Sequence, residues 1–141
     1  MQFDDLFYNL RLYFTPGIGH ITIKRLLKHC GSAEAVYAEK KKTITRIEGI
    51  SQTVVDKLFR PPDNQLIEKE IAKMQKLQIN YCTFLDTSYP VSLQHCYDSP
   101  FMLFYEGKLP SEHHRIVSIV GTRSTTEYGK ACTNQLINDL A

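Results

Sequence analysis

Apolar positions in the first 62 residues recur every three or four residues, and no stretch alternates as a half-buried strand would. This pattern predicts a run of short helices. The first begins at Asp4 or Asp5 and stops at Pro16–Gly17, and the others cover 21–30, 33–38, 43–47 and 52–59. Ser32 and Ser51 are natural N-caps, because a hydroxyl oxygen can accept from the free amides of a first turn. We therefore expect an all-α domain over 1–62.

The double proline at 61–62 separates this region from one amphipathic helix that starts at Asp63 or Asn64 and runs to about Gln78. Its apolar residues form a single stripe and its other face is charged, as is typical of a packing helix. We expect 63–79 to be a connecting helix.

After Asn80 the pattern changes to short apolar runs, which predict strands over 81–85, 100–105 and 115–120, with a helical turn or two after Pro90. The last run leads into Gly121 and then into an amphipathic helix over 126–140, the order that opens a βαβ unit. A parallel strand needs a neighbour beyond its crossover helix, and none follows here. We expect 80–141 to be the truncated start of a Rossmann-like α/β domain, so the fold class is α plus α/β.

Composition fits a folded protein, since 43% hydrophobic and 23% charged residues exclude disorder and collagen-like structure. The apolar runs are far shorter than the roughly 20 residues that span a bilayer, and the acidic N-terminus lacks the basic region of a signal peptide. We expect a cytoplasmic protein without membrane contact. The four cysteines contain no C-x-x-C pair. They are expected to be buried thiols, without a metal or another cofactor.

Charge is uneven along the chain although the net charge is only +2. Residues 1–60 carry ten Lys and Arg against six Asp and Glu, and residues 61–110 carry four against six. The basic excess of the N-terminal region permits a phosphate-bearing partner without requiring one.

A glycine turn, Pro16-Gly17-Ile18-Gly19, lies between the first two predicted helices. Glycines let two backbones approach closely, Ile18 can anchor the turn in the core, and the free amides at the start of the next helix favour an anion. The turn resembles the helix-hairpin-helix motif, which binds DNA phosphates without sequence preference. A tight turn without a ligand is the alternative. Three basic residues follow within two helical turns: Lys24, Arg25 and Lys28.

A second such turn, Ile47-Glu48-Gly49-Ile50-Ser51, places Gly49 32 residues after Gly17. Tandem helix-hairpin-helix units pack as a pseudo-symmetric pair, which would give a sterile-alpha-motif-like domain. Ser51 stands where the motif has its second glycine. The phosphate contact of this copy is therefore open, and a purely structural turn is the alternative.

The third candidate is Gly121-Thr122-Arg123, at the carboxyl end of the last predicted strand, where α/β sheets bind ligands. Loop amides and the Arg123 guanidinium can hold a phosphate there. The loop has neither the G-x-G-x-x-G dinucleotide fingerprint nor a P-loop. A solvent-exposed arginine without a ligand is the alternative.

Four motifs occur in order: D-x-x-Y-P-x-x-L at 86–93, D-x-P-x-x-L-x-x-x-G at 98–107, I-V-G-T-R at 119–123 and Y-G at 128–129. This combination resembles the DNA processing protein A family, also called DprA or Smf. The resemblance implies an extended Rossmann-like domain that binds single-stranded DNA in natural transformation, protects the incoming strand and helps load the RecA recombinase. It also implies a homodimer of the full-length protein, through surfaces beyond this chain. Gly121, Thr122 and Arg123 match the family's phosphate-binding residues.

Two other functions stay open. The same Rossmann variant hosts nucleotide phosphoribohydrolases of the lysine-decarboxylase-like group, whose P-G-G-x-G-T loop and catalytic residues would lie beyond Ala141. The N-terminal region alone is also compatible with a protein-interaction module that makes no DNA contact. No nucleophile with a base and no carboxylate pair stands out, so we expect no enzymatic activity.

Overall fold

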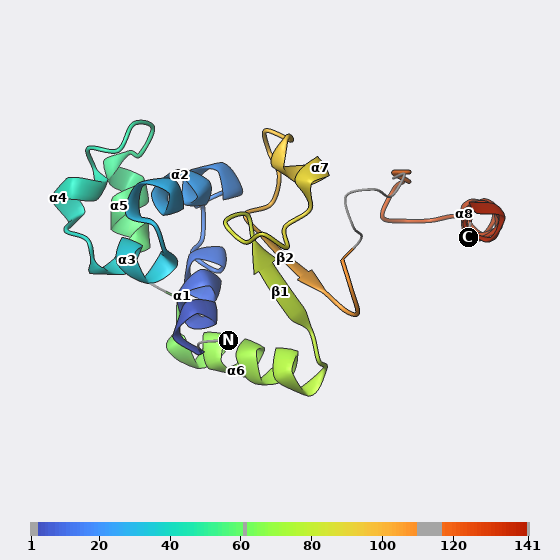
Figure 1. Ribbon diagram of the computed structural model, residues 1–141, viewed down its shortest axis with the longest axis horizontal. Coiled ribbons are helices and arrows are strands. Elements are labelled where there is room, and N and C mark those ends of the chain that lie inside the picture. Colours follow the sequence, from blue (N-terminus) through green and yellow to red (C-terminus); the bar gives the residue numbers. More distant parts are fainter. Residues whose placement is uncertain (1–2, 61, 110–116, 141) are drawn as a thin grey trace.

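The structure is a computed structural model that describes residues 3–60, 62–109 and 117–140. These residues form a mostly helical molecule with one small sheet (Figure 1). In chain order the elements are α1 Phe3–Tyr13, α2 His20–Cys30, α3 Ala33–Ala38, α4 Lys41–Ile44, α5 Gln52–Leu58, α6 Asn64–Lys76, β1 Asn80–Thr83, α7 Val91–Gln94, β2 Met102–Tyr105 and α8 Glu127–Leu140.

Three helices begin where their capping residues predict. The side-chain oxygens of the caps accept backbone amides of the first turn, which satisfies donors that the helix itself leaves free. The pairs are Ser32 with the Ala35 amide at 3.1 Å, Ser51 with the Val54 amide at 3.4 Å, and Asp63 with the Gln65 amide at 3.0 Å.

Two helices have bounds that differ from the prediction. Helix α1 starts at Phe3, so Asp5 lies inside the helix, where its Oδ1 accepts from the Asn9 amide group at 3.2 Å. Helix α4 covers Lys41–Ile44 instead of 43–47. The chain leaves the helix early because the residues after Ile44 form the turn that contains Gly49.

The main core lies among helices α1 to α6. Helix α1 packs against α3 and α6, and α2 packs against α3. Fully buried apolar side chains fill the space between them: Leu10, Leu12, Leu26, Val36, Val55, Leu58 and Ile67. Helix α6 lies against α1 as the packing helix that its apolar stripe predicted, and it leads directly into β1 (Figure 1).

The sheet is a pair of antiparallel strands, with Asn80 opposite Tyr105 and Thr83 opposite Met102. Strand β1 ends at Thr83 instead of continuing to residue 85. The reason is that Asp86 Oδ2 accepts from the Thr83 amide at 2.6 Å and from its hydroxyl at 2.9 Å, which turns the chain. Helix α7 follows this turn.

The predicted strand over 115–120 is not present in the part of the chain that the structure describes. Residues 115 and 116 lie outside the described residues, and 117–120 are irregular, with Val120 92% exposed. A strand exists only as one member of a hydrogen-bonded ladder. No described segment pairs with 117–120, since β1 and β2 pair only with each other.

Helix α8 forms over Glu127–Leu140, close to the predicted range, and it contains no buried residue. Figure 1 shows it apart from the strands and the other helices. The expectation of four buried cysteines is wrong for Cys96 and Cys132, which are exposed, while Cys82 is buried. None of the helices in the described ranges is long and apolar enough to cross a membrane.

Candidate nucleic-acid interface

The two glycine turns have the same backbone geometry. Gly17 has a φ of 73° and Gly49 a φ of 77°, in the left-handed region that residues with a Cβ rarely adopt. The isoleucine that follows each glycine is inserted into the core, and Ile18 and Ile50 are only 7% and 6% exposed. The next residue in each copy is the N-cap of α2 or α5. The turn before α2 and the turn before α5, each with the helix that follows it, therefore form two units of the same backbone geometry. The second unit lies 32 residues after the first.

Each turn is covered by a cation from the other unit. The Arg25 guanidinium lies against Gly49, and the Lys57 ammonium lies against Gly17, so closely that a Cβ on either glycine would overlap the charged group. Arg25 and Lys57 are themselves 32 residues apart, the same offset as the two glycines. The exchange is therefore reciprocal, and the positive φ of both turns requires glycine.

A basic groove lies along the second turn. It has a volume of about 730 Å³ and is lined by Arg25, Lys28, His29, Arg46, Ile47, Glu48 and Gly49. Arg25, Lys28 and Arg46 are all exposed, and none has a carboxylate within 4.0 Å among the described residues. Cations without a carboxylate partner in a concave surface raise the local concentration of anions.

Lys24 was predicted as a DNA contact together with Arg25 and Lys28, but its ammonium is already bonded within the fold. Its ammonium donates to the Tyr97 carbonyl at 3.3 Å and to the Ser99 hydroxyl at 3.0 Å, and the side chain is half-buried. Lys24 therefore ties α2 to the loop before β2 instead of facing a ligand freely. A second cleft of about 660 Å³ opens between α2 and this loop, and Arg25 and Lys28 also form part of its wall.

Sequence reasoning missed Lys57 and Arg46 as members of the turn region. Lys57 could have been found, because the offset that relates Gly17 to Gly49 also pairs it with Arg25. Arg46 directly precedes the second turn in the sequence. Its position in the groove depends on how the two units pack, which has no local sequence signal.

The loop Gly121-Thr122-Arg123 is exposed throughout. Thr122 Oγ1 donates to the Ser124 carbonyl at 2.7 Å, and Arg123 has no ion-pair partner within the described residues. The φ of Gly121 is not positive, and a Cβ there would meet nothing within 4 Å. The described backbone therefore does not require glycine at this position.

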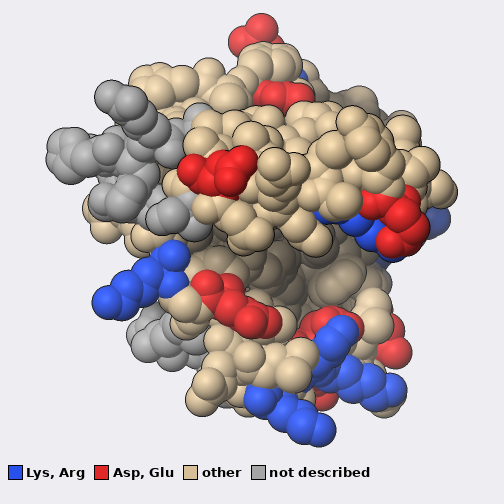
Figure 2. All heavy atoms as spheres, turned by 90° about the vertical axis from the view of Figure 1, so that its right-hand side faces the viewer, with Lys and Arg blue, Asp and Glu red and all other residues tan. Residues whose placement is uncertain are grey.

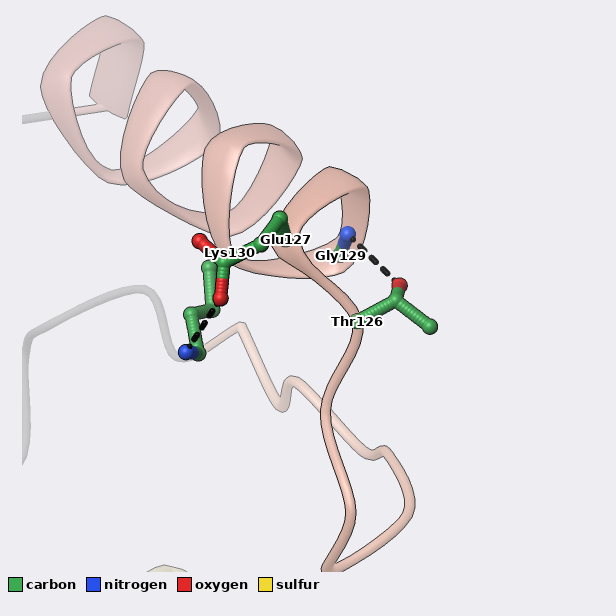
Figure 3. A network of polar contacts seen from close by, with 4 residues as sticks. All are labelled: Thr126, Glu127, Gly129 and Lys130. Atoms are coloured by element: carbon green, nitrogen blue, oxygen red, sulfur yellow. Dashed lines mark hydrogen bonds and ion pairs between the residues drawn. The ribbon is translucent and has the colours of Figure 1, made fainter.

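The first turn of α8, just after this loop, already has polar partners (Figure 3). Thr126 Oγ1 accepts from the Gly129 amide at 3.1 Å, and Glu127 forms an ion pair with Lys130 at 2.7 Å. A carboxylate in the first turn interacts favourably with the positive end of the helix dipole. An anion at this end of α8 would therefore depend on Arg123 more than on the helix amides.

The loop and the two turns are not brought together by any hydrogen bond or ion pair between described residues. The side of the molecule on which α8 lies shows basic and acidic groups in separate small clusters, without a continuous basic surface (Figure 2). The candidate residues therefore form two separate sites, one at the helical turns and one at Gly121–Arg123.

The Asp-x-x-Tyr-Pro motif has a structural role here. Besides the turn that Asp86 fixes, Tyr89 is 1% exposed and its hydroxyl donates to the Pro100 carbonyl at 2.5 Å. Burial raises the pKa of the Tyr89 hydroxyl, which keeps it a hydrogen-bond donor. The motif therefore fastens the segment after β1 to the segment before β2.

Two of the four cysteine thiols lie partly or fully inside the fold. Burial raises the pKa of the Cys30 and Cys82 thiols, which favours the unreactive protonated form. Within the described ranges, no group of three His, Cys, Asp or Glu side chains is arranged to hold a metal ion.

The fold defines a protein with a helical N-terminal region and a small sheet, consistent with the α plus α/β class. Residues 80–141 match the family described as DNA recombination-mediator protein A. This region is therefore similar to the DprA/Smf family, as its motifs indicated.

Two curated relatives agree with this assignment. The chain is 29% identical over 85 residues to "Protein Smf" of Borreliella burgdorferi, an alignment that covers 60% of this chain and 27% of the relative. It is 32% identical over 78 residues to "DNA processing protein DprA" of Streptococcus pneumoniae, which covers 55% of this chain and 26% of the relative. The matched part thus spans about a quarter of each of these proteins.

Proposed function

We propose that the protein binds single-stranded DNA during recombination and natural transformation, protects the incoming strand and helps load the RecA recombinase. The observation that carries this proposal is the family match over 80–141, which contains Gly121, Thr122 and Arg123. The name of the relative from Streptococcus supports a role in DNA processing. We propose a binding protein without turnover that works in the cytoplasm as a homodimer, with its loop and α8 in a Rossmann-like domain.

Arg123 is the main phosphate contact in this proposal. Its guanidinium is exposed and has no carboxylate partner among the described residues, so binding a phosphate requires no existing ion pair to break. A guanidinium can donate two parallel hydrogen bonds to phosphate oxygens. In this proposal Gly121 and Thr122 contribute backbone amides to the same phosphate.

The helical turns supply a second backbone contact. Arg25 and Lys28 are exposed beside the Gly49 turn, and the turn at Gly17–Gly19 repeats its geometry. The proposed contribution of Lys24 is indirect, since its ammonium is already bonded within the fold.

Fluorescence anisotropy of a labelled oligo-dT with the 141-residue chain tests the proposal. Arg123→Ala should weaken binding about 10- to 150-fold, because a hydrogen bond to a charged group contributes ~1.5–3 kcal/mol. Lys130→Ala is the matched control, since it removes one positive charge from the same region but its ammonium is paired with Glu127. Equal affinities of the two variants would refute the role of the loop.

A further inference from the structure

We propose that the cleft between α2 and the loop before β2 stacks one base of a single-stranded polynucleotide on Tyr97, while Arg25, Lys28 and Arg46 hold the adjoining phosphates. This inference rests on the proposed binding of single-stranded DNA. It assigns a binding track to the helical region, separate from the Gly121–Arg123 loop.

Tyr97 is the first observation. It lines the cleft of about 660 Å³, yet its side chain is 78% exposed. Tyrosine presents a flat face on which a base can stack, and such stacking is tolerant of sequence because every base has a π-face.

The backbone that carries Tyr97 is held in place, which is the second observation. Lys24 Nζ donates to the Tyr97 carbonyl at 3.3 Å, and the Ser99 amide donates to the Cys96 carbonyl at 3.3 Å. The buried Tyr89 hydroxyl then fixes Pro100 at the end of the loop. A ring on a fixed loop loses little conformational freedom when a base stacks on it.

The third observation is that the cleft and the basic groove adjoin each other and have two lining residues in common. Arg25 and Lys28 line both the cleft that contains Tyr97 and the basic groove that contains Arg46. A strand with a base on Tyr97 therefore has its next phosphates beside three cations that have no carboxylate within 4.0 Å among the described residues. Basic grooves combined with aromatic platforms are the usual arrangement for binding single strands.

The occupant is a single strand instead of a duplex. Bases of a duplex are already stacked and paired inside the helix, so a surface aromatic reaches one only after it is unpaired. Three of the residues that line the groove are lysine or arginine, and none is Phe, Tyr or Trp, so the groove is suited to contact with the phosphate backbone.

The stacking test compares Tyr97→Ala with Tyr97→Phe in the 141-residue chain, by anisotropy of labelled oligo-dT. Alanine should weaken binding about 5- to 150-fold, the range for one base on an aromatic side chain, while phenylalanine keeps the ring and should bind within about 2-fold of the wild type. An abasic oligomer of the same length should bind both variants alike, because it has no base to stack. A duplex of the same length should bind Tyr97→Ala and the wild type with equal affinity.

The charge test uses the salt dependence of the same binding. Lys28→Gln and Arg46→Gln should each reduce the slope of log affinity against log salt by about 0.7, the value for one phosphate contact on a single strand. Lys69→Gln on α6 is the control, since Lys69 is exposed but lines neither hollow.

The outcomes separate the inference from the proposed function. Wild-type affinity of Tyr97→Ala for oligo-dT, or an equal loss with the abasic oligomer, overturns the stacking site. If Arg123→Ala weakens binding but the substitutions at Tyr97, Lys28 and Arg46 do not, the binding track on the helical region is disproved and the loop remains the DNA contact. If the chain binds no oligonucleotide at low salt, both are wrong.

Discussion

Gly49→Ala tests whether the left-handed backbone of the second turn requires glycine. The wild-type residue has a φ of 77°, and an L-residue in the left-handed region costs ~1–2 kcal/mol. The new Cβ would also overlap the Arg25 guanidinium. That group is the exposed end of a flexible side chain, so it can move aside at little further cost to stability. We therefore expect the free energy of unfolding to fall by about 1–2 kcal/mol, almost all of it from the backbone.

Urea unfolding followed by circular dichroism measures this change, and the midpoint should decrease while the slope stays constant. Gly121→Ala is the matched control. Its φ is not positive and its Cβ position is free of contacts, so its stability should stay within about 0.5 kcal/mol of the wild type. A change in Gly49→Ala no larger than that of the control would refute the argument from backbone conformation.

Arg25→Ala, alone and combined with Gly49→Ala, separates two causes of the lost stability. One is the left-handed backbone at residue 49, and the other is the overlap of the new Cβ with the Arg25 guanidinium. If the cost arises from the backbone, the two substitutions should add within about 0.5 kcal/mol. If the overlap with the guanidinium contributes, removing the arginine should relieve part of the cost of the glycine substitution. The expected result is additivity in stability.

Two further predictions concern the tyrosines near the sheet. Tyr89→Phe should lower the free energy of unfolding by about 1–2 kcal/mol in urea, because the Pro100 carbonyl loses its donor, whereas Tyr97→Phe should change it by less than about 0.5 kcal/mol. Burial, and then the nearby Asp5 carboxylate, raise the pKa of Tyr81 from its ordinary 10 to about 12. Because the folded state favours the protonated phenol, this contribution is complete below pH 10 and is lost as the pH rises from 10 to 12. The effect is small because the ring is half-exposed, and Tyr81→Phe should reduce the fall in stability between pH 9 and pH 12.

Local sequence signals predicted the helical region well. Ser32, Ser51 and Asp63 each cap the helix expected of them, because capping depends on residues only a few positions apart. The start of α1 was missed because an acidic residue stabilises the first turn of a helix nearly as well as it caps one. Both Asp4 and Asp5 fit either position in the sequence.

The sheet region was harder to predict because its structure depends on partners distant in sequence. The apolar run at 117–120 has the composition of a strand, but no described segment supplies a ladder for it. The antiparallel pairing of β1 with β2 likewise depends on the turn at Asp86 and the anchor at Tyr89. The Asp-x-x-Tyr-Pro motif indicated the family resemblance from the sequence alone. Its role in fixing the turn after β1 became visible only in the structure.

The two candidate phosphate sites differ in a property that binding data can separate. The loop offers one cation, Arg123, beside a helix whose first turn already holds a carboxylate. The groove offers Arg25, Lys28 and Arg46 without a carboxylate within 4.0 Å in the described part of the chain. Counterion release from a single strand gives a slope of about −0.7 per phosphate, so the loop alone predicts about −0.7 and the groove adds about −2. The magnitude of the wild-type slope therefore reports whether the helical region takes part in binding, whichever residue contacts the base.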